Sequence, residues 1–252
     1  MKKENRIAFI TMNRPEKRNA MSYDLVKELI STLKAAEEDP EIRVVILAGS
    51  GKGFSAGGDL ETIHRLNDSA SIMNYMKKAL EVVQLIRNMD TYVIAAVQGF
   101  AAGAGFSIAL SADFIVAEKN ATFISSFSNI GLIPDLGLIK TLTDNVPSPL
   151  VKEWISSARP IPANELKDWG LVNRVVEGDV VKEAVSFSEF ITEGPPLANR
   201  FVKQFVNHAE NLNPETSDLY EISIQTLLLQ SKDNKEGIAA FFEKRKPEFT
   251  GK

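Results

Sequence analysis

The chain has 252 residues, with 29 Lys and Arg against 33 Asp and Glu, which gives a formal net charge of -4. The slight excess of acids disfavours nucleic-acid or anionic-membrane binding, and the length suits one large domain or one domain with an appendage. With no Cys, and with His64 and His208 as its only histidines, the composition excludes disulfides, thiol catalysis and thiolate or histidine-rich metal sites.

The first elements along the chain are a strand and a helix. No signal-peptide pattern precedes them, and no apolar run reaches the ~18 residues of a membrane helix, so we expect a cytoplasmic protein. Ile7–Met12 reads as a strand. Ser22 is a suitable N-cap for the following helix, in which four apolar residues recur at helical spacing until Pro40 stops it.

Two buried strands follow, each with a glycine-rich loop behind it. Residues 44–48 (VVILA) form a continuous apolar run, as does Tyr92–Val97, which is typical of parallel strands covered on both faces. The loop at 49–59 leads to a helix with Met73, Met76, Leu80, Val83 and Ile86 on one side. The loop at 99–105 opens a helix that runs to residue 112, before a third strand at 113–117. This alternation predicts an α/β fold with right-handed crossovers.

After Pro134 the predicted elements change from alternating strands and helices to mainly helices. Helices are expected at 150–157, 163–169 and 180–192, with one strand at 171–176. After Gly194-Pro195-Pro196, the pattern is helical throughout, at 197–210, 215–230 and 235–246. We therefore divide the chain into a core at 1–195 and a helical region at 196–252, which could pack on the core or on another subunit.

Three local motifs suggest different chemistries. Residues 53–57 (GFSAG) match the G-x-S-x-G nucleophile elbow of serine hydrolases. However, the preceding strand ends well before Ser55, and neither histidine fits the usual order of the catalytic-triad residues along the chain. Residues 49–53 (GSGKG) lack the Ser or Thr that a phosphate loop needs after its Lys. Residues 103–105 (GAG) open a helix as a dinucleotide fingerprint does, yet Ile108 stands at the third glycine position.

The two glycine-rich loops share a physical property. Small residues let backbone N–H groups approach a ligand, and two loops at the ends of neighbouring strands can aim two donors at one point, as in an oxyanion hole. The alternative is that the glycines serve only turns and close packing.

A set of segments, found in order along the chain, resembles the crotonase family of enoyl-CoA hydratases and isomerases. The segments are residues 13–21 (NRPEKRNAM), 53–60 (GFSAGGDL), 99–105 (GFAAGAG), 112–113 (AD), 130–134 (IGLIP), 242–247 (FEKRKP) and 249–252 (FTGK). The resemblance implies a spiral of β-β-α units with a C-terminal helical trimerisation region at 196–252. It also implies an acyl-CoA thioester as ligand, with coenzyme A as part of the substrate and no further cofactor.

The same resemblance assigns site residues. The backbone N–H groups of Gly58 and Ala104 would polarise the thioester carbonyl and stabilise an enolate. The other acyl-CoA contacts implied by the matched motifs are Arg18, Lys52, Ala56, Asp59 and Leu60. We read Asp59 first as an N-cap or loop-fixing residue, and the alternative for Arg18 and Lys52 is that they are solvated surface charges.

The sequence departs from the hydratase pattern at two positions. Hydratases of this family hold water between two glutamates, where this chain has Ser107 and Phe127. The resemblance also points to Asp135, because several isomerase branches carry an acid at this position, among them dienoyl-CoA, 3-enoyl-CoA and epoxide-derived CoA isomerases. One base that removes and returns a proton is enough for double-bond migration. The alternative is that Asp135 only caps a helix beginning near Gly137.

We therefore expect an acyl-CoA isomerase with Asp135 as its acid/base group. The alternatives are a hydratase or lyase that uses other groups, such as Glu61, and a non-catalytic acyl-CoA-binding protein. The expected assembly is a homotrimer or a dimer of trimers, with no nucleic-acid or membrane partner. We expect the acyl-pocket wall to come from residues 62–75 and the tail helices, and His64 to be a surface or packing residue.

Overall fold

A six-stranded sheet forms the centre of the computed structural model, which describes residues 1–252. The strand order is β1-β2-β3-β4-β6-β9, and every neighbouring pair is parallel except β1 and β2. Its strands are β1 (Lys2–Glu4), β2 (Ile7–Met12), β3 (Val44–Gly49), β4 (Tyr92–Val97), β6 (Phe114–Glu118) and β9 (Arg174–Val176). A second, three-stranded sheet contains β5 (Phe100–Ala102), β7 (Thr122–Ile124) and β8 (Ile161–Pro162).

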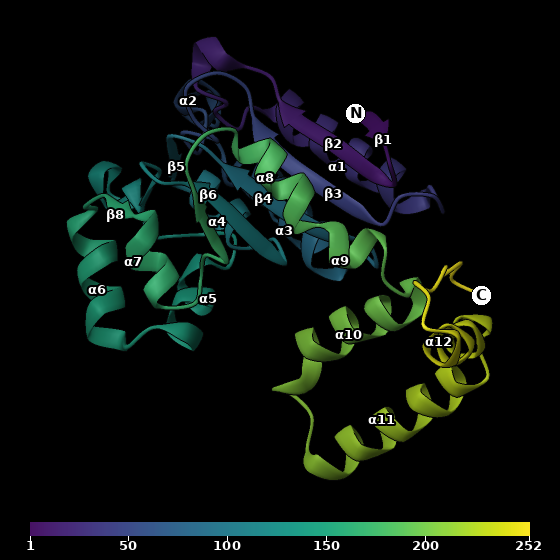
Figure 1. Cartoon of the computed structure of the whole chain (residues 1–252). Helices are drawn as coiled ribbons and strands as arrows, with labels where there is room; N and C mark the ends of the chain where they lie inside the picture. Colours follow the sequence, from purple (N-terminus) through teal and green to yellow (C-terminus); the bar gives the residue numbers. More distant parts are fainter.

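Helices cover both faces of the central sheet and make up the whole C-terminal region (Figure 1). Those of the first part are α1 (Tyr23–Glu38), α2 (Leu60–Arg65), α3 (Ser69–Asn88), α4 (Ala104–Ala109), α5 (Leu138–Asn145), α6 (Ser148–Ser157), α7 (Ala163–Asp168), α8 (Val180–Phe187) and α9 (Glu189–Thr192). Two short 3-10 helices, η1 (Pro15–Lys17) and η2 (Ser126–Ile130), lie in loops. The tail consists of α10 (Pro196–Ala209), α11 (Pro214–Leu229) and α12 (Lys232–Glu243). None of the helices combines the length and the apolar character that crossing a membrane requires.

The apolar strand β3 is buried on both faces, as its composition predicts. Val45 and Leu47 belong to the large core shared with α1 and α3, whereas Val44 and Ile46 pack into a smaller core with α8. The register pairs Val44 with both Ile7 and Tyr92, so β2, β3 and β4 start level with one another. Their carboxyl ends therefore meet at one edge of the sheet, where the two glycine-rich loops emerge.

Two details differ from the sequence predictions. The helix before β4, α3, buries Tyr75, Ala79, Val82, Val83 and Ile86. Met73 and Leu80, which the sequence pattern places on the same side, are 56% and 38% exposed. A separate helix, α2, precedes α3. The second glycine-rich loop contains the short strand β5, which pairs with β7 and has no periodicity that a sequence could reveal.

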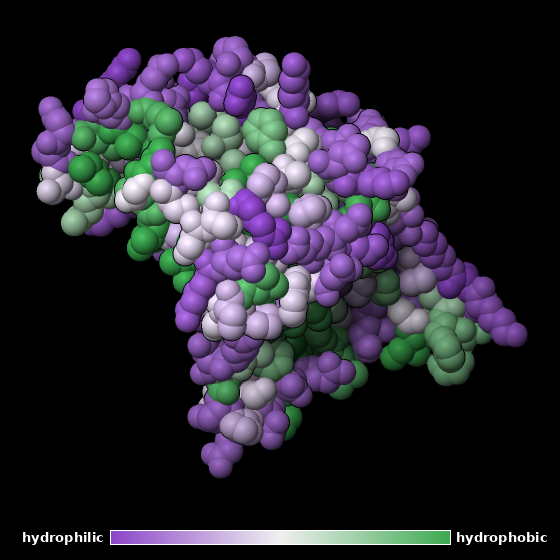
Figure 2. Space-filling view, turned by 90° about the vertical axis from the view of Figure 1, so that its left-hand side faces the viewer, coloured by the Kyte–Doolittle hydropathy of each residue, from purple (hydrophilic) through white to green (hydrophobic).

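The tail is tied to the core by one buried ion pair. The Lys203 ammonium of α10 lies 2.8 Å from the Asp113 carboxylate and donates to the carbonyl oxygens of Ile86 and Thr91 at 3.1 and 2.9 Å. Beyond this anchor the tail extends away from the sheet (Figure 1) and exposes many large apolar side chains, seen as green atoms in the lower part of Figure 2. The most exposed are Val206, Leu219, Ile222, Phe241 and Phe242.

Candidate active site

A cavity of about 790 Å³ lies where the two glycine-rich loops meet α2, α3 and the segment from η2 to α5. Its wall includes Ala56, Gly58, Asp59, Leu60, Ala104 and Asp135, six of the eight residues that the sequence analysis assigned to the site. The cavity therefore brings together segments that lie far apart in the chain.

The two loops touch so closely that only glycine fits at two positions. A Cβ atom on Gly57, whose φ is +96°, would lie 2.6 Å from the Ala102 carbonyl oxygen and 3.1 Å from the Ala104 nitrogen. A Cβ atom on Gly105 would lie 2.7 Å from the Ser55 carbonyl oxygen. The glycines thus serve close packing, and that packing places the Gly58 and Ala104 segments side by side.

Both backbone amides that the family resemblance singles out are free. Neither the Gly58 N–H nor the Ala104 N–H donates a hydrogen bond to any group of the chain, and both residues border the cavity. Ala104 is the first residue of α4, where the helical pattern leaves N–H groups without partners. Two unpaired donors on one cavity wall are the parts from which an oxyanion hole is built.

Ser55, the central residue of the G-x-S-x-G pattern, is not a nucleophile. Its side chain is fully buried and donates to the Asn19 carbonyl oxygen at 2.8 Å. The hydroxyl oxygen of Ser55 in turn accepts a hydrogen bond from the Gly57 N–H at 3.2 Å. The serine therefore joins the segment before α1 to the first glycine-rich loop, and the hydrolase interpretation is wrong.

Replacing Ser55 with alanine should destabilise the protein by about 1–3 kcal/mol, because two buried polar groups lose their partner. Urea unfolding of the variant and the wild type measures this change. Catalysis should survive, whereas loss of a true nucleophile costs about a millionfold in kcat. A folded variant with a millionfold loss would restore the nucleophile interpretation.

Asp135 lies between η2 and α5 with its carboxylate facing a largely apolar surrounding. Its Oδ1 atom is buried without a hydrogen-bond partner, and burial raises the pKa of this carboxyl group to about 6. The N-cap of α5 is Gly137, and no side chain caps that helix. The capping alternative for Asp135 is therefore wrong, and its carboxylate is left available to a ligand.

The two positions that hold glutamates in hydratases have other roles in this chain. Phe127 lines the cavity and is 7% exposed. Ser107 is buried and donates its hydroxyl to the backbone carbonyl oxygen of Asp135 at 3.1 Å, a contact that the sequence did not reveal. Ser107 thus holds the backbone that carries the carboxylate, and neither residue offers a second acid or base.

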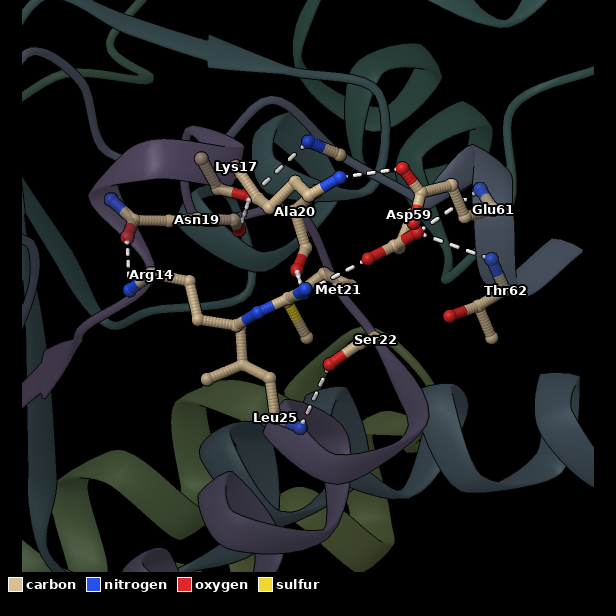
Figure 3. Close-up of polar contacts among 12 residues, drawn as sticks. Arg14, Lys17, Asn19, Ala20, Met21, Ser22, Leu25, Asp59, Glu61 and Thr62 are labelled. Atoms are coloured by element: carbon tan, nitrogen blue, oxygen red, sulfur yellow. Dashed lines mark hydrogen bonds and ion pairs between the residues drawn. The ribbon is translucent and has the colours of Figure 1, made fainter.

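Asp59 fixes the loop beside Gly58, as predicted. Its carboxylate caps α2 by accepting from the N–H groups of Glu61 and Thr62, and it pairs with Arg14 at 3.0 Å (Figure 3). Burial alone would raise the pKa of Asp59, but these hydrogen bonds outweigh it and lower the pKa. Arg14 also donates to the Ala20 carbonyl oxygen at 2.8 Å and so ties the segment before α1 to the site.

Lys17 is a cavity residue that the sequence analysis missed. Its ammonium group lies 2.5 Å from the Glu61 carboxylate (Figure 3). Both residues line the cavity. The side chains are 45% and 65% exposed, which places the pair at the mouth. Glu61, the alternative hydratase base, is therefore engaged by a cation at the mouth of the cavity.

Three further candidates lie outside this wall. Arg18 and Lys52 are exposed, form no ion pair and do not line the cavity, so their contact with coenzyme A stays a prediction. His64 is also exposed and does not line it. The expected acyl wall from residues 62–75 is present, in part through Ile63, Leu66, Ile72 and Tyr75, whereas the tail of the same chain contributes no lining residue.

Comparison with known proteins gives consistent matches over the whole chain. The family model described as Enoyl-CoA hydratase/isomerase matches residues 2–252. The chain is 32% identical to the 1,2-epoxyphenylacetyl-CoA isomerase of Escherichia coli (strain K12), over 99% of this chain and 97% of that protein. It is also 32% identical to the 2,3-dehydroadipyl-CoA hydratase of the same strain, over 99% and 97%.

Solved structures match equally well. An enoyl-CoA hydratase from Polaromonas sp. JS666 superposes with a TM-score of 0.95 at 35% identity, covering 99% of this chain and 98% of that one. The α/β fold with a helical C-terminal region, predicted from the sequence, is thereby confirmed.

Proposed function

The chain belongs to the enoyl-CoA hydratase/isomerase family, and we propose that it moves the double bond of an enoyl-CoA thioester, with Asp135 as the only acid/base group. The observation that carries this proposal is the unpartnered Asp135 carboxylate in the cavity that also holds the free amides of Gly58 and Ala104. The relative named an isomerase supports it, since isomerisation occurs within the family at 32% identity.

The reaction needs two proton transfers and one stabilised anion. The ionised Asp135 removes a proton from carbon 2 of a 3-enoyl-CoA, and the electron pair moves onto the thioester oxygen. The N–H groups of Gly58 and Ala104 stabilise this dienolate by hydrogen bonds. The carboxylic acid then returns the proton to carbon 4, which leaves the 2-enoyl-CoA and an ionised Asp135, with no atom gained or lost.

Hydration is disfavoured by the same residues. Addition of water across the double bond needs one group to activate water and another to protonate carbon 2. Phe127 and Ser107 provide neither, and Glu61 is paired with Lys17 at the mouth. The remaining alternatives, a hydratase that uses Glu61 and a non-catalytic acyl-CoA-binding protein, predict hydroxylated product and no turnover, respectively.

The proposed base predicts a pH profile. Because the carboxylate must be ionised to accept a proton, kcat/KM for isomerisation should rise with pH and level off above the Asp135 pKa of about 6. Below that pH it should fall about tenfold for each pH unit. Initial rates between pH 4.5 and 8 with a 3-enoyl-CoA test this. A flat profile over that range would exclude a base with this pKa.

We also propose that the helical region at 196–252 assembles the protein as a homotrimer, alone or as a dimer of trimers. The exposed apolar side chains of α10 to α12 support this, because a surface of this kind marks an interaction site. Coenzyme A enters as part of the substrate, with Arg18 and Lys52 as proposed contacts, and the proposed chemistry requires no further cofactor.

A further inference from the structure

We propose that the acyl chamber accepts an uncharged, apolar acyl group and rejects acyl groups that end in a carboxylate. The inference rests on the proposed function, because it takes the cavity beside Gly58, Ala104 and Asp135 as the acyl-CoA site. It goes further by naming the acyl class that the walls select.

The walls of the chamber are mainly apolar. Ile63, Ile72 and Met76 line it from α2 and α3, and Ile130 and Leu132 line it from η2 and the loop behind it. Contact with such side chains favours hydrocarbon, because apolar groups gain by leaving water. A carboxylate in the same place would lose its hydration without replacement.

The charged groups of the chamber offer no cation to compensate such a loss. The only cationic residue on its wall is Lys17, whose ammonium is held by Glu61 at 2.5 Å. Arg14 pairs with Asp59, so that guanidinium is engaged as well.

The remaining charge on the wall is Asp135, which has no ion-pair partner and would repel a second carboxylate. The Tyr75 hydroxyl, a neutral donor whose pKa is raised to about 12 by burial, already donates to the Met21 carbonyl oxygen at 2.6 Å. The other polar side chains on the wall, Ser126 and Asn129, are neutral, so no free cation is left to balance the charge of an acyl carboxylate.

The test compares hexanoyl-CoA with adipoyl-CoA, two saturated six-carbon thioesters that differ only in a terminal methyl or carboxylate group. Titration calorimetry at pH 8 requires no turnover, so a failure of the isomerase chemistry leaves this test intact. Hexanoyl-CoA should bind at least about 30-fold more tightly, which corresponds to about 2 kcal/mol. Equal affinities would overturn the inference alone. If hexanoyl-CoA binds no better than free coenzyme A, the cavity is not the acyl site and the proposed function fails with it.

Charge variants separate electrostatics from shape. Ile72 is 45% exposed on α3, so a lysine at this position is compatible with the helix. Ile72→Lys should improve adipoyl-CoA binding at least tenfold relative to hexanoyl-CoA, since it supplies the missing cation. The matched Ile72→Gln variant should not change that ratio in favour of adipoyl-CoA. The monomethyl ester of adipoyl-CoA, which lacks the charge, should bind the wild type like an uncharged acyl-CoA. Weak binding of the ester, or an unchanged ratio in Ile72→Lys, would show that charge is not the determinant.

Discussion

Replacing Asp135 with asparagine should lower kcat for 3-enoyl-CoA isomerisation by about a thousandfold, because a positioned acid/base group contributes roughly 10²–10⁴. The amide has nearly the shape of the carboxyl group but cannot accept and return the proton. Binding of a saturated acyl-CoA should change little, since the amides of Gly58 and Ala104 are untouched. Single-turnover rates together with calorimetry separate the two effects. Isomerisation at the wild-type rate would remove Asp135 from the mechanism.

Stability measurements on the same variant distinguish a lost base from a lost fold. The folded pKa of Asp135 is about 6, above its ordinary value of 3.8, so folding disfavours the ionised form. Its stabilising contribution is complete below pH 3.8 and is lost as the pH rises through 6. Asp135→Asn should therefore be more stable than the wild type at pH 8, by on the order of 1 kcal/mol for a partly solvated carboxylate, and no more stable at pH 4. An inactive variant that is also less stable at pH 8 would point to misfolding.

Replacing Ala104 with proline should lower kcat/KM by about a hundredfold or more, because loss of one oxyanion-hole donor costs roughly 10²–10³. Ala104 is the first residue of α4, where proline is best tolerated in a helix, so the substitution removes the N–H with the least damage to the fold. Thermal melting with circular dichroism checks that the variant folds.

The matched control is Ala104→Gly, which keeps the N–H group. It should retain activity within a few-fold, at a stability cost of about 1 kcal/mol for glycine in a helix. If the folded proline variant and the glycine variant have equal kcat/KM, the Ala104 amide is not a donor to the reacting oxygen.

Much of the fold could be predicted from local sequence patterns. Ile7–Met12 and Tyr92–Val97 have the predicted bounds, because both are short, mainly apolar segments that end at turn residues. The predicted face of α3 was right at Val83 and Ile86 but wrong at Met73 and Leu80, because the apolar residues of this helix form more than one stripe. Only tertiary packing decides that Tyr75 and Ala79 meet the core while Met73 and Leu80 face outward. The strand β5 exists only through its pairing with β7, so no local signal identifies it.

The candidate site, like the fold, could be predicted from the sequence only in part. Gly58, Ala104 and Asp135 could be proposed from the family resemblance, because each lies in or beside a short segment that matches the family. The contacts of Arg14 with Asp59, of Lys17 with Glu61 and of Ser107 with the Asp135 carbonyl could not, since each joins segments between 28 and 45 residues apart. A single sequence contains no direct record of such pairings.

The engaged carboxylates on the cavity wall support Asp135 as the proposed base. Asp59 and Glu61 lie on the same cavity wall, yet each is bound to a cation, whereas Asp135 is not. A paired carboxylate is a poor base because the cation favours its ionised form, while burial without a partner makes Asp135 more basic. The surroundings of the three carboxylates, rather than their residue type, therefore favour Asp135 for the proposed proton transfer.

Product analysis of the wild-type enzyme is the most direct test of single-base isomerisation. A 3-enoyl-CoA and the corresponding 2-enoyl-CoA are each incubated with the enzyme in water enriched in oxygen-18, and the products are followed by mass spectrometry. The expected result is interconversion of the two enoyl-CoA isomers, with no oxygen-18 in the acyl chain. Rapid formation of labelled 3-hydroxyacyl-CoA would contradict it and show that the cavity activates water despite Phe127 and Ser107.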